Sequence, residues 1–216
     1  LILGFVLAGT KIVSAIADPL VGILSDRTRT RWGRRKPFLI AAAVITGVLL
    51  PFIFRVPDGG STVQFGYIAA TLSFYFLTHS FFAVPYMALG YELTDDYDER
   101  TNIFAWKSYI GMAGIFASIW AYWFTLRPVF GNEMNGAQVL GAIVGVIVII
   151  GSILVTRGTR EIGERHAIKK AKIPVTAALK TTITNRSFLM IQGAVLVVAL
   201  GLGIDATIGM YLHVHY

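Results

Sequence analysis

The stretch AQVLGAIVGVIVIIGSILVT, residues 137–156, decides the fold class of this chain. None of its twenty residues is charged. A helix of about twenty apolar residues is long enough to cross the roughly 30 Å hydrocarbon core of a bilayer. A buried strand of a soluble protein is much shorter, about 4–8 residues. Residues 137–156 therefore predict a membrane-spanning helix.

Five further segments share this apolar character and length. The six predicted spans are residues 1–24, 37–56, 64–90, 102–126, 137–156 and 187–213. Over the whole chain of 216 residues, 55% are hydrophobic and only 14% are charged, whereas about a quarter of the residues of a soluble domain are charged. The chain has no cysteine, so a disulfide framework and a thiolate metal site are excluded. The composition predicts an all-α membrane protein and excludes a soluble α/β protein.

The basic residues lie mainly in alternate connections between the spans. The first, third and fifth connections together contain fifteen Lys and Arg, and the second and fourth contain two. The positive-inside rule places the basic connections in the cytoplasm. This placement accounts for the net charge of +7 without a nucleic-acid partner. The first span then runs from outside to inside, so we expect one more helix before residue 1.

Residues 157–186 are too polar to cross a membrane and include eight Lys and Arg. They are predicted to form a cytoplasmic linker with a short amphipathic helix near residues 174–183, lying at the membrane interface. Residues 1–156 are then the N-terminal helical half without its first helix. Residues 187–216 are the first helix of a C-terminal half.

Four ionisable side chains lie inside the predicted spans: Lys11, Asp18, Lys107 and Asp205. Each costs about 2.5–3.5 kcal/mol at the centre of a membrane helix, so each is a candidate functional group. Asp205 follows two glycines that permit close helix packing, and the sequence identifies no partner for it. Lys107 is predicted either to contact a solute or to extend its ammonium group towards the interface.

Asp18 is the best candidate for binding a cation. The spacing of Lys11, Ser14 and Asp18 places them on one helix face, where the two charges can partly neutralise each other. Pro19 lacks an N–H group, which frees the carbonyl group of Ala15 beside the carboxylate. Such oxygen atoms can bind a cation, and the carboxylate can bind a proton. The alternative is an aspartate at a helix end that faces cytoplasmic water.

The third and fourth spans supply candidate solute contacts. His79, Ser80, Ala83 and Met87 are expected on one helix face around a proline. His79 alone also fits a histidine hydrogen-bonded between helices. Trp106 can stack on a sugar ring or mark the membrane interface.

Two sequence blocks carry a family resemblance. The block DPLVGILSDRT at residues 18–28, followed by RWGRRKP at residues 31–37, resembles the signature between the second and third helices of the major facilitator superfamily. Within it, the pattern is similar to that of the glycoside–pentoside–hexuronide:cation symporters, which include the melibiose permeases. PYMALGYELT at residues 85–94, with DERT at residues 98–101, resembles the fourth-to-fifth helix junction of the same branch.

The resemblance implies the major facilitator fold, with about twelve helices in two halves that rock around a midplane site. The six spans are then helices two to seven of a secondary active transporter. It also implies a multi-pass protein of the bacterial inner membrane. The expected partners are a small solute (a sugar or glycoside), the lipid bilayer and the remainder of the chain.

The cation site of that family maps onto this chain residue by residue. One aspartate of the family's site is retained as Asp18. A second aspartate is replaced by Ser14, an asparagine is replaced by Ala17, and Ser80 stands at the position of a hydroxyl residue. Two sodium ligands are therefore replaced, whereas a proton needs a single carboxylate. The resemblance favours coupling to a proton over sodium, and no metal or other cofactor is expected.

The solute contacts of the family map less well. Its carboxylate falls on Ala83, its tryptophan on Met87 and its arginine on Lys107. Without the carboxylate, the bidentate acceptor for sugar hydroxyls is lost. The expected solute is therefore a glycoside or a similar small polar molecule.

A gate is expected at the cytoplasmic end of the helices. Its predicted residues are Gly22, which would let two helices approach closely, and the charged residues Asp26, Arg27, Arg34, Arg35 and Glu92. Such a charge network can hold two halves in one conformation and release them in another. Simple positive-inside anchoring would account for the arginines but not for Gly22 and Asp26.

Two other functions remain open. A lipid or lysolipid carrier of the same superfamily would have a lateral opening and a cavity lined by Phe, Met and Leu. A membrane sensor or scaffold would show no flux and would tolerate substitution of Asp18. An enzyme is not expected, because the sequence contains no nucleophile–base pair or metal-ligand cluster.

Overall fold

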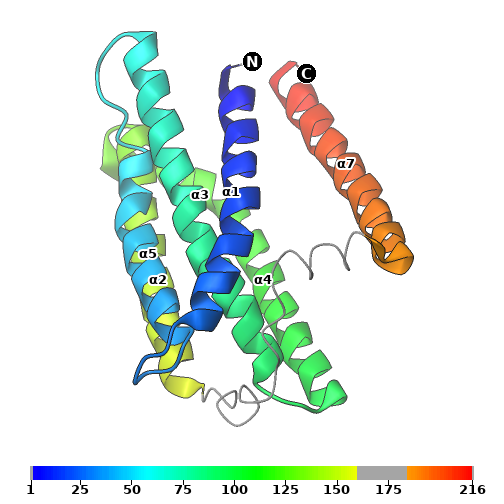
Figure 1. The fold of residues 1–216 in the computed structure, drawn as a ribbon. Helices are drawn as coiled ribbons and strands as arrows, with labels where there is room; N and C mark the ends of the chain where they lie inside the picture. The colour runs from blue at the N-terminus through cyan, green and yellow to red at the C-terminus, as the bar shows by residue number, and fades with distance from the viewer. Residues whose placement is uncertain (1, 160–183, 216) are drawn as a thin grey trace. The chain divides into compact units, whose positions relative to one another are not determined.

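The computed structural model describes residues 2–159 and 184–215, with side chains described for residues 9–159, 184–199 and 201. The chain divides into two units, Leu1–Arg165 and His166–Tyr216, and each is described by itself. The regular structure of the described residues is entirely helical (Figure 1). This confirms the predicted all-α class.

Each predicted span coincides with one long helix of the described residues. The helices are α1 (Ile2–Arg27), α2 (Lys36–Ile53), α3 (Ser61–Glu92), α4 (Tyr97–Thr125), α5 (Glu133–Gly158) and α7 (Arg186–His215), with a short 3-10 helix η1 (Pro128–Phe130). By length and composition, α2, α3 and α5 are able to cross a membrane among the described residues. The predicted amphipathic helix near residues 174–183 lies outside the described residues.

Local capping sets where two of these helices begin. The Asp96 side chain accepts a hydrogen bond from the Glu99 amide at 2.9 Å, so α4 begins five residues before the predicted apolar span. Asn132 accepts from the Asn135 amide at 2.7 Å and caps α5 in the same way. Both helices therefore begin in a polar segment, before the apolar part of the sequence.

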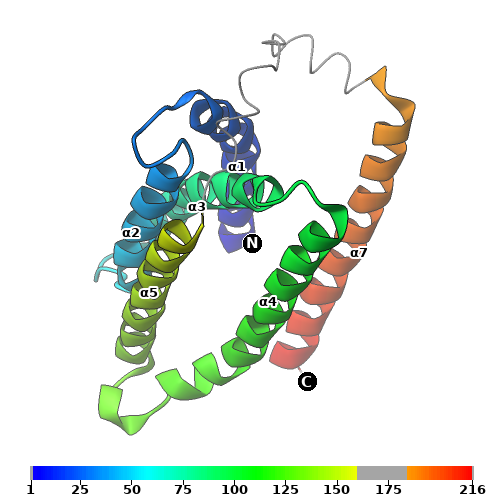
Figure 2. The ribbon, with the colours of Figure 1, turned by 90° about the horizontal axis from the view of Figure 1, so that it is seen from below.

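Helices α2 and α5 lie side by side along a seam of small residues (Figures 1 and 2). A Cβ atom on Gly47 would lie 2.7 Å from the Gly145 carbonyl oxygen, and one on Gly145 would lie 2.9 Å from the Gly47 carbonyl carbon. Ser152 Oγ donates a hydrogen bond to the Leu39 carbonyl at 3.1 Å across the same seam. The two backbones approach this closely only because both glycines lack a side chain.

Helix α3 packs against both α1 and α2. Val21 of α1 and Leu89 of α3 are buried within this part of the unit. Gly22 faces α3, but a Cβ atom there would lie 3.7 Å from Val84 Cγ1, which is an ordinary contact. Within this unit the close helix approach predicted at Gly22 is not observed; the close approach of α2 and α5 lies at Gly47 and Gly145.

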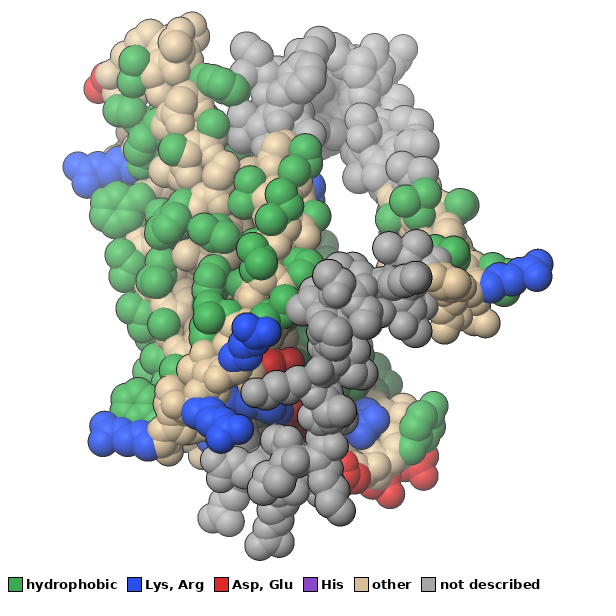
Figure 3. Space-filling view, viewed as in Figure 1, with side chains coloured by type: hydrophobic (Ala, Val, Ile, Leu, Met, Phe, Trp, Pro, Cys, Tyr) green, Lys and Arg blue, Asp and Glu red, His purple; other side chains and the backbone are tan. Residues whose placement is uncertain are grey.

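Helix α4 has the least contact with its neighbours in the first unit, touching α3 and α5. Its apolar side chains are largely exposed, namely Trp106, Tyr109, Ile110, Met112, Ile115, Phe116, Ile119, Trp120, Tyr122 and Trp123. Figure 3 shows hydrophobic side chains over the middle of this unit. Acidic and basic side chains gather around the end at which α1 leads into α2. An apolar surface between charged ends is the pattern of a membrane-embedded bundle.

Candidate functional site

A cluster of four charged residues joins the ends of α1, α2 and α3; we call it the Arg35 cluster (Asp26, Arg34, Arg35 and Glu92). Arg35 Nη2 donates to Asp26 Oδ1 at 2.9 Å, and Arg35 Nη1 lies 2.9 Å from Glu92 Oε2. Arg34 donates to the other carboxylate oxygen of Glu92. The cluster therefore connects the ends of three consecutive helices.

A tight turn brings the two arginines back towards α1. Gly33 adopts a φ of 106°, which side chains rarely tolerate. The Thr30 hydroxyl accepts a hydrogen bond from the Trp32 amide at 3.3 Å and donates one to the Gly33 carbonyl at 2.5 Å. The sequence between α1 and α2 is thus folded so that Arg35 can reach both carboxylates.

Arg35 is the centre of this cluster. Its side chain is 7% exposed, against 26% for Glu92 and 57% for Asp26. The structure thus brings together four of the six predicted gating residues. The other two are not part of the cluster. Arg27 is exposed at the C-terminal end of α1, and Gly22 lies earlier in the same helix.

Removing the Glu92 charge is expected to destabilise the protein. Glu92→Gln leaves the half-buried Arg34 and the buried Arg35 without their shared carboxylate, and losing one partner of such a pair costs about 2–3 kcal/mol. The thermal unfolding midpoint of the purified variant should fall by several degrees. Asp98→Asn removes an equal charge from an exposed position and should leave the midpoint unchanged. Equal midpoints for the two variants would contradict a structural role for Glu92.

The candidate cation site lies on α1. Asp18 is exposed there, directly before Pro19. Among the described residues, no hydrogen bond or ion pair joins Asp18 to Lys11, Ser14 or Ser80. The Lys11 ammonium instead lies 5.1 Å from the ring centroid of Phe76 on α3. The partial neutralisation expected between Lys11 and Asp18 is therefore not observed.

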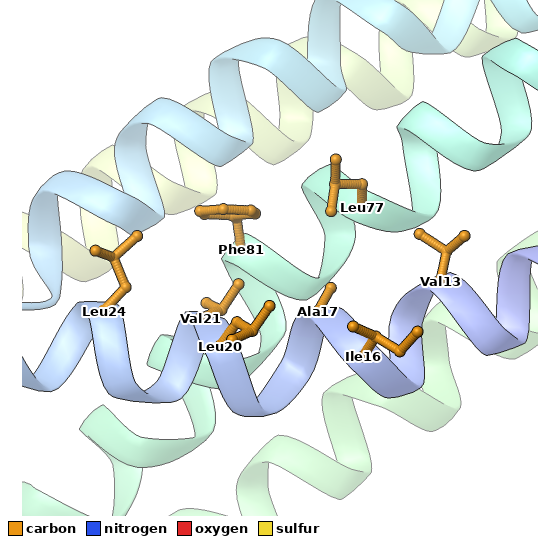
Figure 4. Close-up of a pocket in the computed structure, with 8 residues that line it drawn as sticks. All are labelled: Val13, Ile16, Ala17, Leu20, Val21, Leu24, Leu77 and Phe81. Carbon is orange, nitrogen blue, oxygen red and sulfur yellow. The ribbon is translucent and has the colours of Figure 1, made fainter.

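An apolar groove of about 430 Å³ lies between α1 and α3 (Figure 4). Its lining consists only of apolar side chains: Val13, Ile16, Ala17, Leu20, Val21, Leu24, Leu77 and Phe81. Ala17, which the resemblance predicts to replace an asparagine of the cation site, is part of this lining. The groove is within the size range of small-molecule pockets but offers no polar group.

The predicted face of α3 is divided in the structure. His79 is exposed and its ring centroid lies 6.3 Å from that of Tyr75, whereas Ser80 is buried. Ala83 is half-buried and Met87 is exposed. The structure thus does not place His79 and Ser80 in one environment, because adjacent helical residues point about 100° apart.

Lys107 extends from α4 to α3. Its Nζ atom lies 3.0 Å from Met87 Sδ, 6.0 Å from the ring centroid of Tyr86 and 5.7 Å from that of Phe104. Lys107 and Met87, both predicted solute contacts, therefore touch each other. Trp106 beside them is exposed and packs edge-to-face on Tyr109 at 6.1 Å.

Some predicted or contributing residues fall elsewhere. Asp205 belongs to α7, but its side chain lies outside the described residues. The aromatic rings of Phe76 and Phe104, which contact the two membrane lysines, were not predicted. No local pattern marks them, because aromatic residues are frequent throughout the spans.

A bundle of apolar helices with charged ends and isolated charges inside the apolar part defines an α-helical membrane protein. The family described as MFS/sugar transport protein matches residues 1–216. The chain belongs to this family, which confirms the resemblance drawn from the two motif blocks.

Curated relatives agree with this assignment. The Inner membrane symporter YicJ of Escherichia coli (strain K12) is 32% identical over 48% of this chain and 23% of its own length. The Uncharacterized symporter sll1374 of Synechocystis sp. (strain ATCC 27184 / PCC 6803 / Kazusa) is 36% identical over 55% of this chain and 23% of its own. The Lactose permease of Leuconostoc lactis is 27% identical over 88% of this chain and 32% of its own. The chain matches between 23% and 32% of the length of these three relatives.

Proposed function

We propose that the transporter containing this chain carries a glycoside, or a similar small polar solute, by proton-coupled symport with alternating access. Family membership supports transport, and the names of the relatives, symporter and lactose permease, support symport of a sugar-type solute. The transporter would be a multi-pass protein of the bacterial inner membrane.

The observation that carries proton coupling is the isolation of Asp18. It is an aspartate in the apolar part of α1, beside a proline. The family resemblance sets Ser14 and Ala17 at the positions of two further sodium ligands. Sodium is held by several oxygen ligands, whereas one carboxylate suffices for a proton. Protonation of Asp18 would remove a charge from the apolar part of the bundle and so bias which side is open.

The Arg35 cluster would act as the gate at the cytoplasmic end. Its ion pairs join α1, α2 and α3 into one rigid unit. In an alternating-access cycle, a rigid half can rock against the other half without internal rearrangement.

The experiment that tests this proposal is uptake by the full-length transporter in proteoliposomes. Glycosides are offered with an inward proton gradient, an inward sodium gradient or no gradient. We expect accumulation with the proton gradient alone. Accumulation driven only by the sodium gradient would reject the proton as the coupling ion. The absence of uptake of any glycoside would reject glycosides as the solute class.

The apolar groove between α1 and α3 favours a second candidate, a lipid or lysolipid carrier. An acyl chain fits a groove without polar groups better than a sugar does. In the same proteoliposomes, movement of a fluorescent lysolipid between leaflets, with no glycoside uptake, would support this function instead.

A further inference from the structure

We infer that an anionic phospholipid binds along one face of α4, with its phosphate group on the guanidinium of Arg127. The face consists of Met112, Phe116, Trp120 and Trp123, which recur at intervals of three or four residues; we call it the apolar stripe of α4. The lipid would be a bound component of the membrane and not the transported solute. The inference therefore goes beyond the proposed function, and it concerns a surface that none of the sites described above uses.

The apolar stripe faces away from the helices that contact α4. Phe104 packs on Tyr91 of α3 with the ring centroids 4.7 Å apart, and a Cβ atom on Gly136 of α5 would lie 2.8 Å from the Thr125 Cα atom. Phe104 and Thr125 are 21 positions apart, almost six helical turns, so they mark one side of α4. Phe116 is rotated from them by about 120° and 180°. Each residue of the stripe is accordingly more than half exposed in the first unit.

Arg127 lies at the end of this stripe. Its guanidinium carbon is 3.4 Å from the ring centroid of Trp123. The connection that follows is packed against the same end of α4, because the ring of Phe130 lies 5.1 Å from that of Phe124. Asn135 Nδ2 also donates a hydrogen bond to the Phe130 carbonyl at 3.2 Å. These contacts hold the guanidinium over the last ring of the stripe.

The charge of Arg127 is not compensated by the part of the chain that the structure describes. Its side chain is exposed, its one contact there is with the Trp123 ring, and no carboxylate lies within 4.0 Å of it, that of Glu133 included. The guanidinium N–H groups therefore remain available, and their geometry matches two oxygens of a phosphate. A lipid with a net negative charge would compensate the arginine, whereas a zwitterionic lipid brings its own cation. The arrangement therefore favours an anionic phospholipid.

The order of residues along the stripe matches the layers of one membrane leaflet. Trp123 and Met112 are eleven positions apart, or about 16 Å along the helix, and one leaflet contributes about 15 Å of hydrocarbon. Tryptophan is enriched at the membrane–water interface. With Trp120 and Trp123 at that interface, Arg127 lies among the headgroups, and Phe116 and Met112 lie beside the acyl chains. One phospholipid would thus contact the arginine and the stripe together.

The test measures lipid binding to the purified full-length transporter by native mass spectrometry. Dioleoylphosphatidylglycerol is compared with dioleoylphosphatidylcholine, which has the same acyl chains. An arginine beside an anionic headgroup corresponds to a preference of roughly five- to tenfold, so the tightest site should prefer phosphatidylglycerol by that factor. Arg127→Gln should abolish the preference, and Arg127→Lys should keep most of it. Arg55→Gln is the matched control, because Arg55 is an exposed arginine that follows α2, and this variant should keep the preference in full.

A second measurement tests whether the lipid lies on the stripe. Phosphatidylglycerol with brominated acyl chains should quench the part of the tryptophan emission that Trp123→Phe removes. If that emission is not quenched, another part of the transporter covers the stripe and the inference fails.

Four binding results would also overturn the inference. They are equal affinity for the two lipids, an unchanged preference in Arg127→Gln, an equal loss of preference in Arg55→Gln, and displacement of the lipid by an equal concentration of inorganic phosphate. The last result would assign Arg127 to a free anion. Thermal unfolding of each variant shows whether it is folded, and Arg127→Lys keeps the charge if Arg127→Gln does not fold.

Discussion

Asp18→Asn is expected to abolish the accumulation of solute driven by a proton gradient, while exchange of solute across the membrane partly continues. The amide is similar in size to the carboxylate but cannot take up and release a proton. The carrier could then still bind solute and change conformation, but without a proton the solute would only equilibrate. Proteoliposomes containing the full-length variant, assayed for gradient-driven uptake and for counterflow, measure the two activities separately.

Asp58→Asn is the matched control for this prediction. Asp58 is an exposed aspartate in the connection between α2 and α3, so the same chemical change there should leave both activities unaltered. Normal proton-driven accumulation by Asp18→Asn would refute the coupling role of Asp18. Loss of uptake in both variants would show that the change acts on folding or insertion, which thermal unfolding then checks.

Gly145→Ala is expected to have the largest effect on stability. The new Cβ atom would lie 2.9 Å from the Gly47 carbonyl carbon and 3.1 Å from its Cα atom. These are backbone atoms that cannot rotate away, so α2 and α5 must move apart and lose the contacts of the whole seam. Overpacking of this kind costs about 1–3 kcal/mol, and more where backbone must shift.

Gly151→Ala on the same helix is the matched control, and it is expected to leave the stability unchanged or to raise it. A Cβ atom at Gly151 has no neighbour within 4 Å, and alanine favours a helix over glycine by about 1 kcal/mol. The unfolding midpoint in detergent should therefore fall for Gly145→Ala and stay equal or rise for Gly151→Ala. If the unfolding midpoint fell equally in both variants, α5 would be sensitive to any glycine-to-alanine change. The close approach at Gly145 would then not explain the loss of stability.

The residues of the Arg35 cluster could be predicted from the sequence, but their arrangement in space could not. Asp26, Arg34, Arg35 and Glu92 were all proposed from the motif blocks, because charged residues at helix ends gather on one side of a membrane. Sequence reasoning could not show that Arg35 is the buried centre. That depends on the turn at Gly33, which directs one arginine inward and leaves the other at the edge.

The close packing of α2 and α5 is marked in the sequence by two glycines of α5. Gly141 and Gly145 have the spacing of a helix-packing motif within an apolar span, which is a recognised sign of close helix contact. The prediction instead assigned close packing to Gly22. Gly22 has no second glycine at this spacing, since Asp18 and Asp26 stand four residues to either side, and Val84 lies at an ordinary contact distance from it.

The sequence by itself determined the all-α membrane class, the position of the helices and the family, because these follow from the length of apolar runs, the placement of charges and short motifs. The tertiary structure decided which charged groups have partners. Arg35 meets two carboxylates, whereas Lys107 meets a thioether and aromatic rings. The physical reason is that charge compensation acts over a few ångströms between different helices, and residue spacing along one helix does not encode which neighbour it will face.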